Sequence, residues 1–97
     1  MSVTSINWSN KNGTGTRTCK CGSWMDHWIK FSKESWPTSC SVANCSSPPT
    51  LGAHIINPEV QGERIVPMCY SCNGLDTQFN LKGGVSLVKA NTSETCK

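Results

Sequence analysis

One stretch early in the chain carries large hydrophobic side chains at helical spacing. Four side chains fall at positions i, i+3, i+4 and i+7 and therefore share one face of a helix: Trp24, His27, Trp28 and Phe31. Ser23, followed by Asp26, has the capping-box pattern that begins a helix, and Pro37 predicts an end near Ser35 or Trp36. Such an aromatic face indicates packing in the core; a platform for base stacking or peptide binding is the alternative.

The middle of the chain has the pattern of a two-stranded hairpin. Two short β-rich runs cover residues 51–56 and 64–68, and the residues between them include the Asn, Pro and Gly typical of turns. Residues 73–79 are consistent with a short helix. Alternation over residues 85–90 predicts a final strand.

The N-terminal region has a different composition. Residues 1–18 are rich in Ser, Thr, Asn and Gly, with Ile6 and Trp8 as isolated hydrophobic residues. This composition predicts a flexible arm, because so little apolar surface does not offset the entropy lost on ordering. We therefore expect the arm over residues 1–18 and a single domain over residues 19–97.

Cysteine spacing adds a metal site to this picture. Four residues separate Cys40 from Cys45, and two separate Cys69 from Cys72. Such pairs form knuckles that turn two thiolates toward one point, and two knuckles supply the four sulfurs of a tetrahedral structural Zn²⁺ site. Unrelated thiols or two disulfides are the alternatives. The total of seven cysteines is odd, which does not suit a fully paired disulfide framework.

The remaining cysteines allow a second zinc site. Cys19, Cys21 and Cys96 provide three thiolates, and a closed tetrahedron needs one more ligand. His27 is the natural candidate, because the first turns of the predicted helix would carry it close to Cys19 and Cys21. The alternative is that Cys96 is a free thiol of the tail and that His27 only packs beside Trp24.

Size and charge restrict the remaining choices. The chain has 97 residues, and its hydrophobic content of 36% includes the cysteines. Because so small a core gives little stability by itself, a metal that crosslinks the fold is expected. The sequence carries no apolar run of secretory or membrane-spanning type, which predicts a cytoplasmic protein without a membrane partner. We expect a monomer. The net charge of +3 would tolerate a polyanionic partner but does not require one.

The order of elements resembles that of a treble-clef zinc finger: knuckle, β-hairpin, knuckle and short helix. The fold class that follows is a small α+β zinc-stabilised domain, in which an aromatic-rich helix precedes this unit and a C-terminal strand follows it. Two segments resemble the core of the HNH (His-Me finger) nuclease group: Gly-Ala-His-Ile-Ile-Asn-Pro at residues 52–58 and Ile-Val-Pro-Met-Cys-Tyr-Ser-Cys-Asn at residues 65–73.

The chain is also similar to a family of small uncharacterised bacterial proteins. The shared pattern runs CxCGSWxxHW, CxVxxC, GAH, PxCxxxN and an ETC-containing tail, and it covers residues 19–96. This resemblance implies the fold and zinc binding, and it implies no particular activity.

The nuclease resemblance can be followed residue by residue. His54 matches the general base that activates water for attack on a phosphodiester. Ala53 stands where many such nucleases have a metal-binding Asp, and Arg64 stands near the position of the group's Asn. We therefore expect a non-enzymatic zinc module that presents a surface to a macromolecular partner, either protein or nucleic acid. The alternative is a minimal HNH-type metal-dependent nuclease with His54 as its base.

Overall fold

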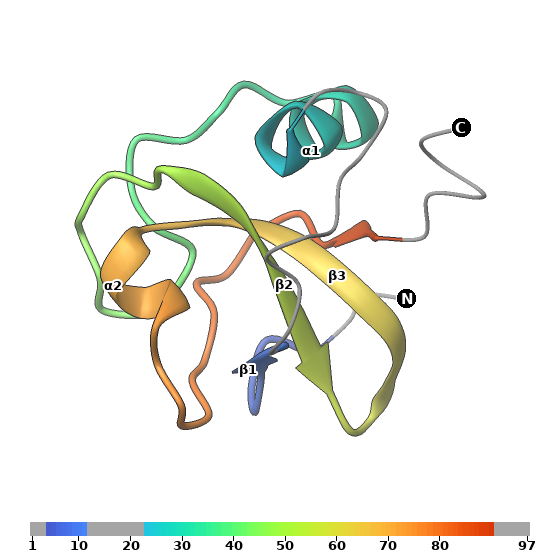
Figure 1. Ribbon diagram of the computed structural model, residues 1–97, viewed down its shortest axis with the longest axis vertical. Coiled ribbons are helices and arrows are strands. Elements are labelled where there is room, and N and C mark those ends of the chain that lie inside the picture. Colours follow the sequence, from blue (N-terminus) through green and yellow to red (C-terminus); the bar gives the residue numbers. More distant parts are fainter. Residues whose placement is uncertain (1–3, 12–22, 91–97) are drawn as a thin grey trace.

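The computed structural model describes residues 4–11 and 23–90, which form a small α+β domain (Figure 1). Its strands form one antiparallel sheet in the order β1-β2-β3-β4. The elements, in chain order, are β1 (Ser9–Asn10), α1 (Trp24–Ser32), β2 (Leu51–Asn57), β3 (Val60–Met68), α2 (Tyr70–Asn73) and β4 (Val88–Lys89). No helix in these two described ranges is long and apolar enough to cross a membrane.

The hairpin expected in the middle of the chain is formed by β2 and β3. Its second strand is longer than the sequence pattern predicts, because pairing continues past residue 64 to Asn57 and Val60 at the turn. The register shifts between Ile55 and Asn57. Gly62 lies on β3 with a φ of 84°, a conformation that favours glycine.

Helix α1 begins where the capping pattern predicts. The amide of Asp26 donates to the hydroxyl of Ser23, the N-cap residue, over 3.1 Å. The helix ends at Ser32, earlier than the proline-based prediction. Lys33 adopts the left-handed conformation with a φ of 61°, and its amide donates to the carbonyl of Ile29. This left-handed cap ends the helix before Pro37 can influence it.

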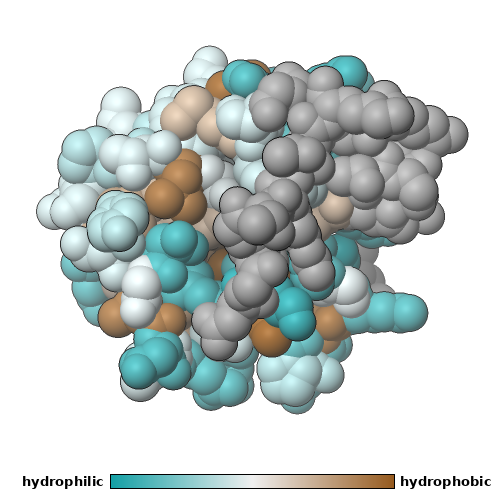
Figure 2. Space-filling model, in the orientation of Figure 1, coloured by the Kyte–Doolittle hydropathy of each residue, from teal (hydrophilic) through white to brown (hydrophobic). Residues whose placement is uncertain are grey.

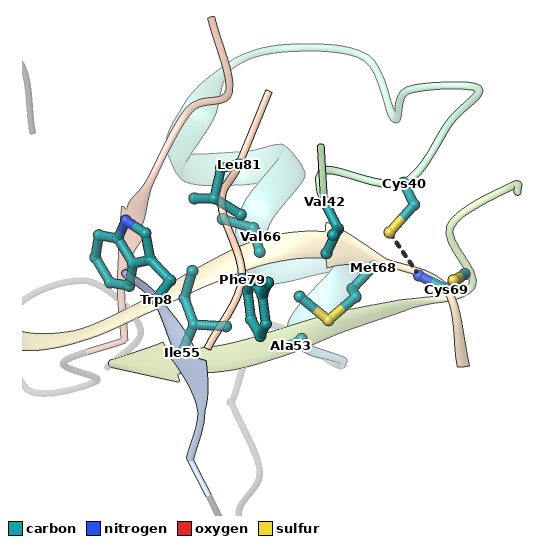
Figure 3. Packing of buried hydrophobic residues seen from close by; sticks show 10 residues of the cluster. All are labelled: Trp8, Cys40, Val42, Ala53, Ile55, Val66, Met68, Cys69, Phe79 and Leu81. Carbon is teal, nitrogen blue, oxygen red and sulfur yellow. Dashed lines mark hydrogen bonds between the residues drawn. The ribbon is translucent and has the colours of Figure 1, made fainter. Parts of the chain in front are cut away.

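The two faces of the sheet carry separate hydrophobic clusters. One face holds a larger cluster, which includes Cys40 and Cys69, and Figure 3 shows its buried residues: Trp8, Cys40, Val42, Ala53, Ile55, Val66, Met68, Cys69, Phe79 and Leu81. The opposite face is covered by α1, whose Trp28 packs with Ile65 and Val88. The helical aromatic face therefore belongs to the core, and the buried positions of His27 and Trp28 do not form an open stacking platform.

Part of the expected flexible arm is packed into the domain. Residues 9–10 form β1 on the edge of β2, and Trp8 is fully buried. The backbone of Trp8 exchanges two hydrogen bonds with Phe79, of 2.9 and 2.7 Å. Burial of the Trp8 ring offsets the conformational entropy that this polar segment loses when it becomes ordered. The expected boundary at residue 18 lies outside the described residues.

The region after the second cysteine pair differs from the sequence prediction. Residues 73–79 do not form a helix beyond α2, which ends at Asn73. The chain instead runs alongside two distant segments. Phe79 forms an isolated antiparallel β-bridge with Trp8, and Leu81 forms one with Val42. The final strand, expected over residues 85–90, is limited to Val88–Lys89, because only these residues pair with β3.

The close approach of α1 to β2 gives a testable prediction. A Cβ atom at Gly52 would lie 2.6 Å from the backbone carbonyl carbon of Trp24, which cannot move without shifting the helix. We expect Gly52→Ala to lower the free energy of unfolding by about 1–3 kcal/mol, as overpacking does elsewhere. Urea denaturation measures the effect. Gly83→Ala is the control, since an added Cβ there meets nothing within 4 Å; equal stability of the two variants would contradict the prediction.

Candidate metal centre

The first cysteine pair lies on a tight turn between α1 and β2. The amide of Cys45 donates to the carbonyl of Val42 over 3.1 Å, and Asn44 has a φ of 68°. Asn tolerates this left-handed conformation better than most residues. The turn therefore folds Cys45 back toward Cys40, as the spacing predicted.

The second pair lies where β3 ends and α2 begins. Cys69 is the N-cap of α2, and its sulfur accepts a hydrogen bond from the amide of Cys72 over 3.5 Å. Because β2 and β3 are paired up to Leu51 and Met68, the hairpin brings the chain after Met68 back beside the first knuckle. Residues distant in the sequence are thereby placed at one site.

All four cysteines of the predicted first site meet. The sulfurs of Cys40, Cys45, Cys69 and Cys72 all lie within 4.8 Å of one another and could hold a metal ion. The sulfurs of Cys45 and Cys69 are 3.7 Å apart. A tetrahedral ion with Zn–S bonds of ~2.3 Å separates its sulfurs by about 3.8 Å. A disulfide needs about 2.05 Å, and the four cysteines are free thiols.

Burial and hydrogen bonding shape the electrostatics of the cluster. Cys40 and Cys69 are buried, and Cys45 and Cys72 are partly exposed. The amide of Cys69 donates to the sulfur of Cys40 over 3.4 Å, the dashed line in Figure 3. Such N–H groups aimed at sulfur favour the thiolate form, which is the form that binds a metal.

Three of the thiols have pKa values displaced from the ordinary 9.0. Burial raises the pKa of Cys40 and of Cys72, since desolvation disfavours the charged form. The backbone amide of Ser47, helped by the side chain of Cys72, lowers the pKa of Cys45 to about 7. Without a metal, protons therefore occupy most of the Cys40 and Cys72 thiols at neutral pH, and a bound cation would displace them.

These pKa values predict a steep pH dependence of metal affinity. At pH 6 the thiols of Cys40, Cys45 and Cys72 are mainly protonated in the metal-free state. Binding then releases at least three protons, so the affinity should fall about a thousandfold or more for each pH unit below 6. Competition with a chromogenic chelator at several pH values measures the slope. A slope of only tenfold would mean that binding releases a single proton, and it would contradict the protonation of three thiols in the metal-free state.

His54, the candidate general base, lies on the other side of the sheet from the cysteines. It pairs with Ile65, which belongs to the cluster under α1, whereas its neighbour Ala53 faces the cluster that contains Cys40. The imidazole is buried, with 5% of the residue exposed, and its ring lies edge-on to Trp24 at 4.3 Å between centroids.

His27, the candidate fourth ligand of the second site, is fully buried on α1. Its Nε2 atom lies 2.8 Å from the carbonyl oxygen of Lys89. Because a carbonyl only accepts, Nε2 carries the proton in the neutral ring and Nδ1 is the nitrogen suited to a metal. Cys19, Cys21 and Cys96 lie outside the described residues.

Two polar side chains contact the knuckles without any signal in the sequence. The ammonium group of Lys82 donates to the carbonyl of Cys45, and the amide of Asn10 donates to the carbonyl of Cys72. Both residues are far from the cysteines in sequence, and neither belongs to a recognisable motif. Their positions become evident only once the N-terminal segment and the segment around Phe79 are seen to pack together.

Comparison of the chain with protein-family models, with curated proteins and with solved structures finds no match in any of the three. The resemblance to the HNH group therefore depends on residues 52–58 and 65–73 alone.

Proposed function

We propose that the protein is a structural zinc-binding module, non-enzymatic, which presents a surface to a macromolecular partner. The observation that carries this proposal is the convergence of four cysteine sulfurs within 4.8 Å of one another. Four thiolates form a soft ligand set that suits Zn²⁺, and a tetrahedron closed by four protein ligands leaves no position for substrate.

The order of elements around the site supports a treble-clef arrangement. The first knuckle is followed by the β2–β3 hairpin, the second knuckle and α2. In this arrangement the ion joins two loops that hydrogen bonds alone would hold weakly. The metal would therefore stabilise the fold rather than take part in a reaction.

A structural role also agrees with the surroundings of His54. A general base must come within hydrogen-bond reach of the proton that it removes. His54 lies beneath Trp24 and is 5% exposed, and the neighbouring Ala53 offers no ligand for a catalytic cation. These features favour a finger that has lost nuclease chemistry.

A plasmid-nicking assay with Mg²⁺ or Mn²⁺ tests the absence of nuclease activity. We expect both the zinc-loaded wild-type protein and the His54→Ala variant to leave supercoiled DNA intact. Cleavage by the wild-type protein that disappears in a folded His54→Ala variant would instead support the HNH-type nuclease.

The surface beside the second knuckle is the part of the domain best suited to a partner. Tyr70, which lies between Cys69 and Cys72, is 81% exposed, and Leu75 nearby in the chain is 39% exposed. On the face drawn in Figure 2, hydrophobic residues form small separate spots among polar ones. An exposed aromatic ring could stack on a base or enter a protein pocket.

Titration with DNA at several salt concentrations separates the two kinds of partner. Affinity that falls steeply with salt, and that Tyr70→Ala weakens, would identify a nucleic-acid partner. The absence of binding at low salt would point to a protein partner.

We further propose a second zinc ion, bound by Cys19, Cys21, His27 and Cys96. The support is the Nε2–H bond from His27 to Lys89, the kind of bond that orients a metal-binding imidazole. Ser23 and Ala90 are the described residues nearest in sequence to Cys21 and Cys96. They directly flank α1, which carries His27, and β4, whose Lys89 carbonyl binds it. The expected stoichiometry is two zinc ions per chain, falling to one in Cys96→Ser. A wild-type chain with one zinc would contradict this second site and leave the first intact.

A further inference from the structure

We propose that Lys82 and Asn10 are positioning residues of the metal centre, with one residue assigned to each knuckle. This inference rests on the proposed function, because it concerns how the four-cysteine site keeps its metal. Neither side chain would bind the ion. Each instead holds the backbone carbonyls that fix the position of cysteine ligands.

Lys82 spans the two ends of the first knuckle. Its Nζ atom donates to the carbonyl of Cys45 over 2.6 Å and to the hydroxyl of Ser39 over 3.1 Å. Its backbone amide donates to the carbonyl of Ser41 over 2.8 Å. One residue thereby binds the chain before Cys40, after Cys40 and at Cys45.

The charge of Lys82 adds to this mechanical role. A zinc ion with four thiolates carries a net charge of −2, and the ammonium group is attached directly to the knuckle that supplies two of these sulfurs. A cation in a partly buried position offsets part of that charge and strengthens the hydrogen bond that it donates. Among the other lysines of the described residues, Lys30, Lys33 and Lys89 are exposed and Lys11 is half-buried, and none of them makes such a contact with a knuckle.

Asn10 holds the second knuckle in a comparable way. Its Nδ2 atom donates to the carbonyl of Cys72 over 3.0 Å and to the carbonyl of Leu75 over 2.9 Å. Both N–H groups of the amide are therefore used, which fixes the end of α2 against β1. An aspartate here would have nearly the same shape, but in place of Nδ2 it would set a carboxylate oxygen, which donates no hydrogen bond, against both carbonyls.

The two contacts link the metal centre to the rest of the fold. Lys82 follows Leu81, which forms a β-bridge with Val42 in the first knuckle. Asn10 lies on β1, two residues after the buried Trp8. Residues that orient metal ligands through hydrogen bonds commonly contribute ten- to a hundredfold to metal affinity. Loss of either contact should loosen one knuckle and speed the release of the metal, with all four sulfurs still able to bind.

The test compares near-isosteric variants, Lys82→Met and Asn10→Asp, as full-length zinc-loaded chains. An excess of chelator is added under native conditions, and the release of zinc is followed with time. We expect both variants to release zinc about tenfold or more faster than the wild type. The Co²⁺-loaded variants should keep the absorption of four thiolates, because no ligand has been removed.

Three control variants separate positioning from general loss of stability. Lys30→Met makes the same charge change at an exposed position on α1. Asn80→Asp makes the same amide change at an exposed residue, whose Oδ1 accepts a hydrogen bond from the amide of Asn7. Val88→Ala destabilises the cluster on the other face of the sheet. All three should release zinc within about twofold of the wild-type rate.

Each result bears on a different claim. Wild-type release rates in Lys82→Met and Asn10→Asp would overturn this inference, and so would equal acceleration in Val88→Ala. Loss of the Co²⁺ thiolate absorption in either variant would also overturn it, because the residue would then be needed to form the site at all. A wild-type chain that takes up neither Zn²⁺ nor Co²⁺ would contradict the proposed function itself.

Discussion

Replacement of a single buried thiol should unfold the domain: we expect Cys40→Ser to lose both the bound metal and the folded state. Cys40 is fully buried, and its sulfur accepts the amide of Cys69 from the other knuckle. A structural zinc in small domains contributes roughly 10–16 kcal/mol, whereas whole domains retain only about 5–15 kcal/mol of net stability. A serine hydroxyl does not replace a thiolate as a zinc ligand.

Circular dichroism in the near ultraviolet, together with metal content, measures this outcome. Ser71→Ala is the matched control, because Ser71 is exposed and lies in the second knuckle between Cys69 and Cys72. The control should remain folded and metal-loaded. A Cys40→Ser chain that stays folded would show that the hydrophobic clusters suffice without the metal.

Trp8→Ala should cause the second large loss, about 3–5 kcal/mol in the free energy of unfolding of the zinc-loaded protein. The Trp8 side chain is fully buried, and its Nε1 atom donates to the carbonyl of Thr4 over 2.9 Å. Its removal would leave a large cavity beside Phe79 and Ile55 in the cluster that also holds two of the cysteines.

Urea denaturation at a fixed zinc concentration gives the size of this effect. Ile6→Ala is the control, since Ile6 is two residues earlier and 49% exposed. The control should change stability by less than about 0.5 kcal/mol. Similar stabilities for Trp8→Ala and the wild type would mean that residues 4–11 are the flexible segment that their composition suggested.

The elements governed by local rules could be read from the sequence. Ser23 and Asp26 mark the start of α1, and the short spacings of the two cysteine pairs predict the knuckles. Two short β-rich runs separated by turn residues predict the β2–β3 hairpin, which then brings the knuckles together. Each of these signals depends on residues only a few positions apart, so no knowledge of the tertiary fold is needed.

The contacts between distant segments could not be read in the same way. Trp8 stands alone in a polar stretch, and its burial depends on Phe79, which lies near the other end of the chain. Lys82 and Asn10 contact the knuckles through backbone carbonyls, which carry no sequence signature. Nor could the end of α1 be predicted, because Lys33 is not a typical residue for a left-handed cap.

The placement of His54 bears directly on the nuclease resemblance. The Gly-Ala-His segment does lie on a strand of the hairpin, as the nuclease resemblance implies. Gly52 accommodates the backbone of α1, and Trp24 covers the imidazole. The helix that precedes the first knuckle therefore lies over the face that a phosphodiester would have to reach.

Native mass spectrometry of the purified full-length chain tests the central claim most directly, since one spectrum reports compactness and bound metal together. If four thiolates and a zinc ion hold the domain, the compact low-charge ions will carry at least one zinc, and metal-free chains will appear only as extended high-charge ions. Compact ions with no metal bound would contradict the account.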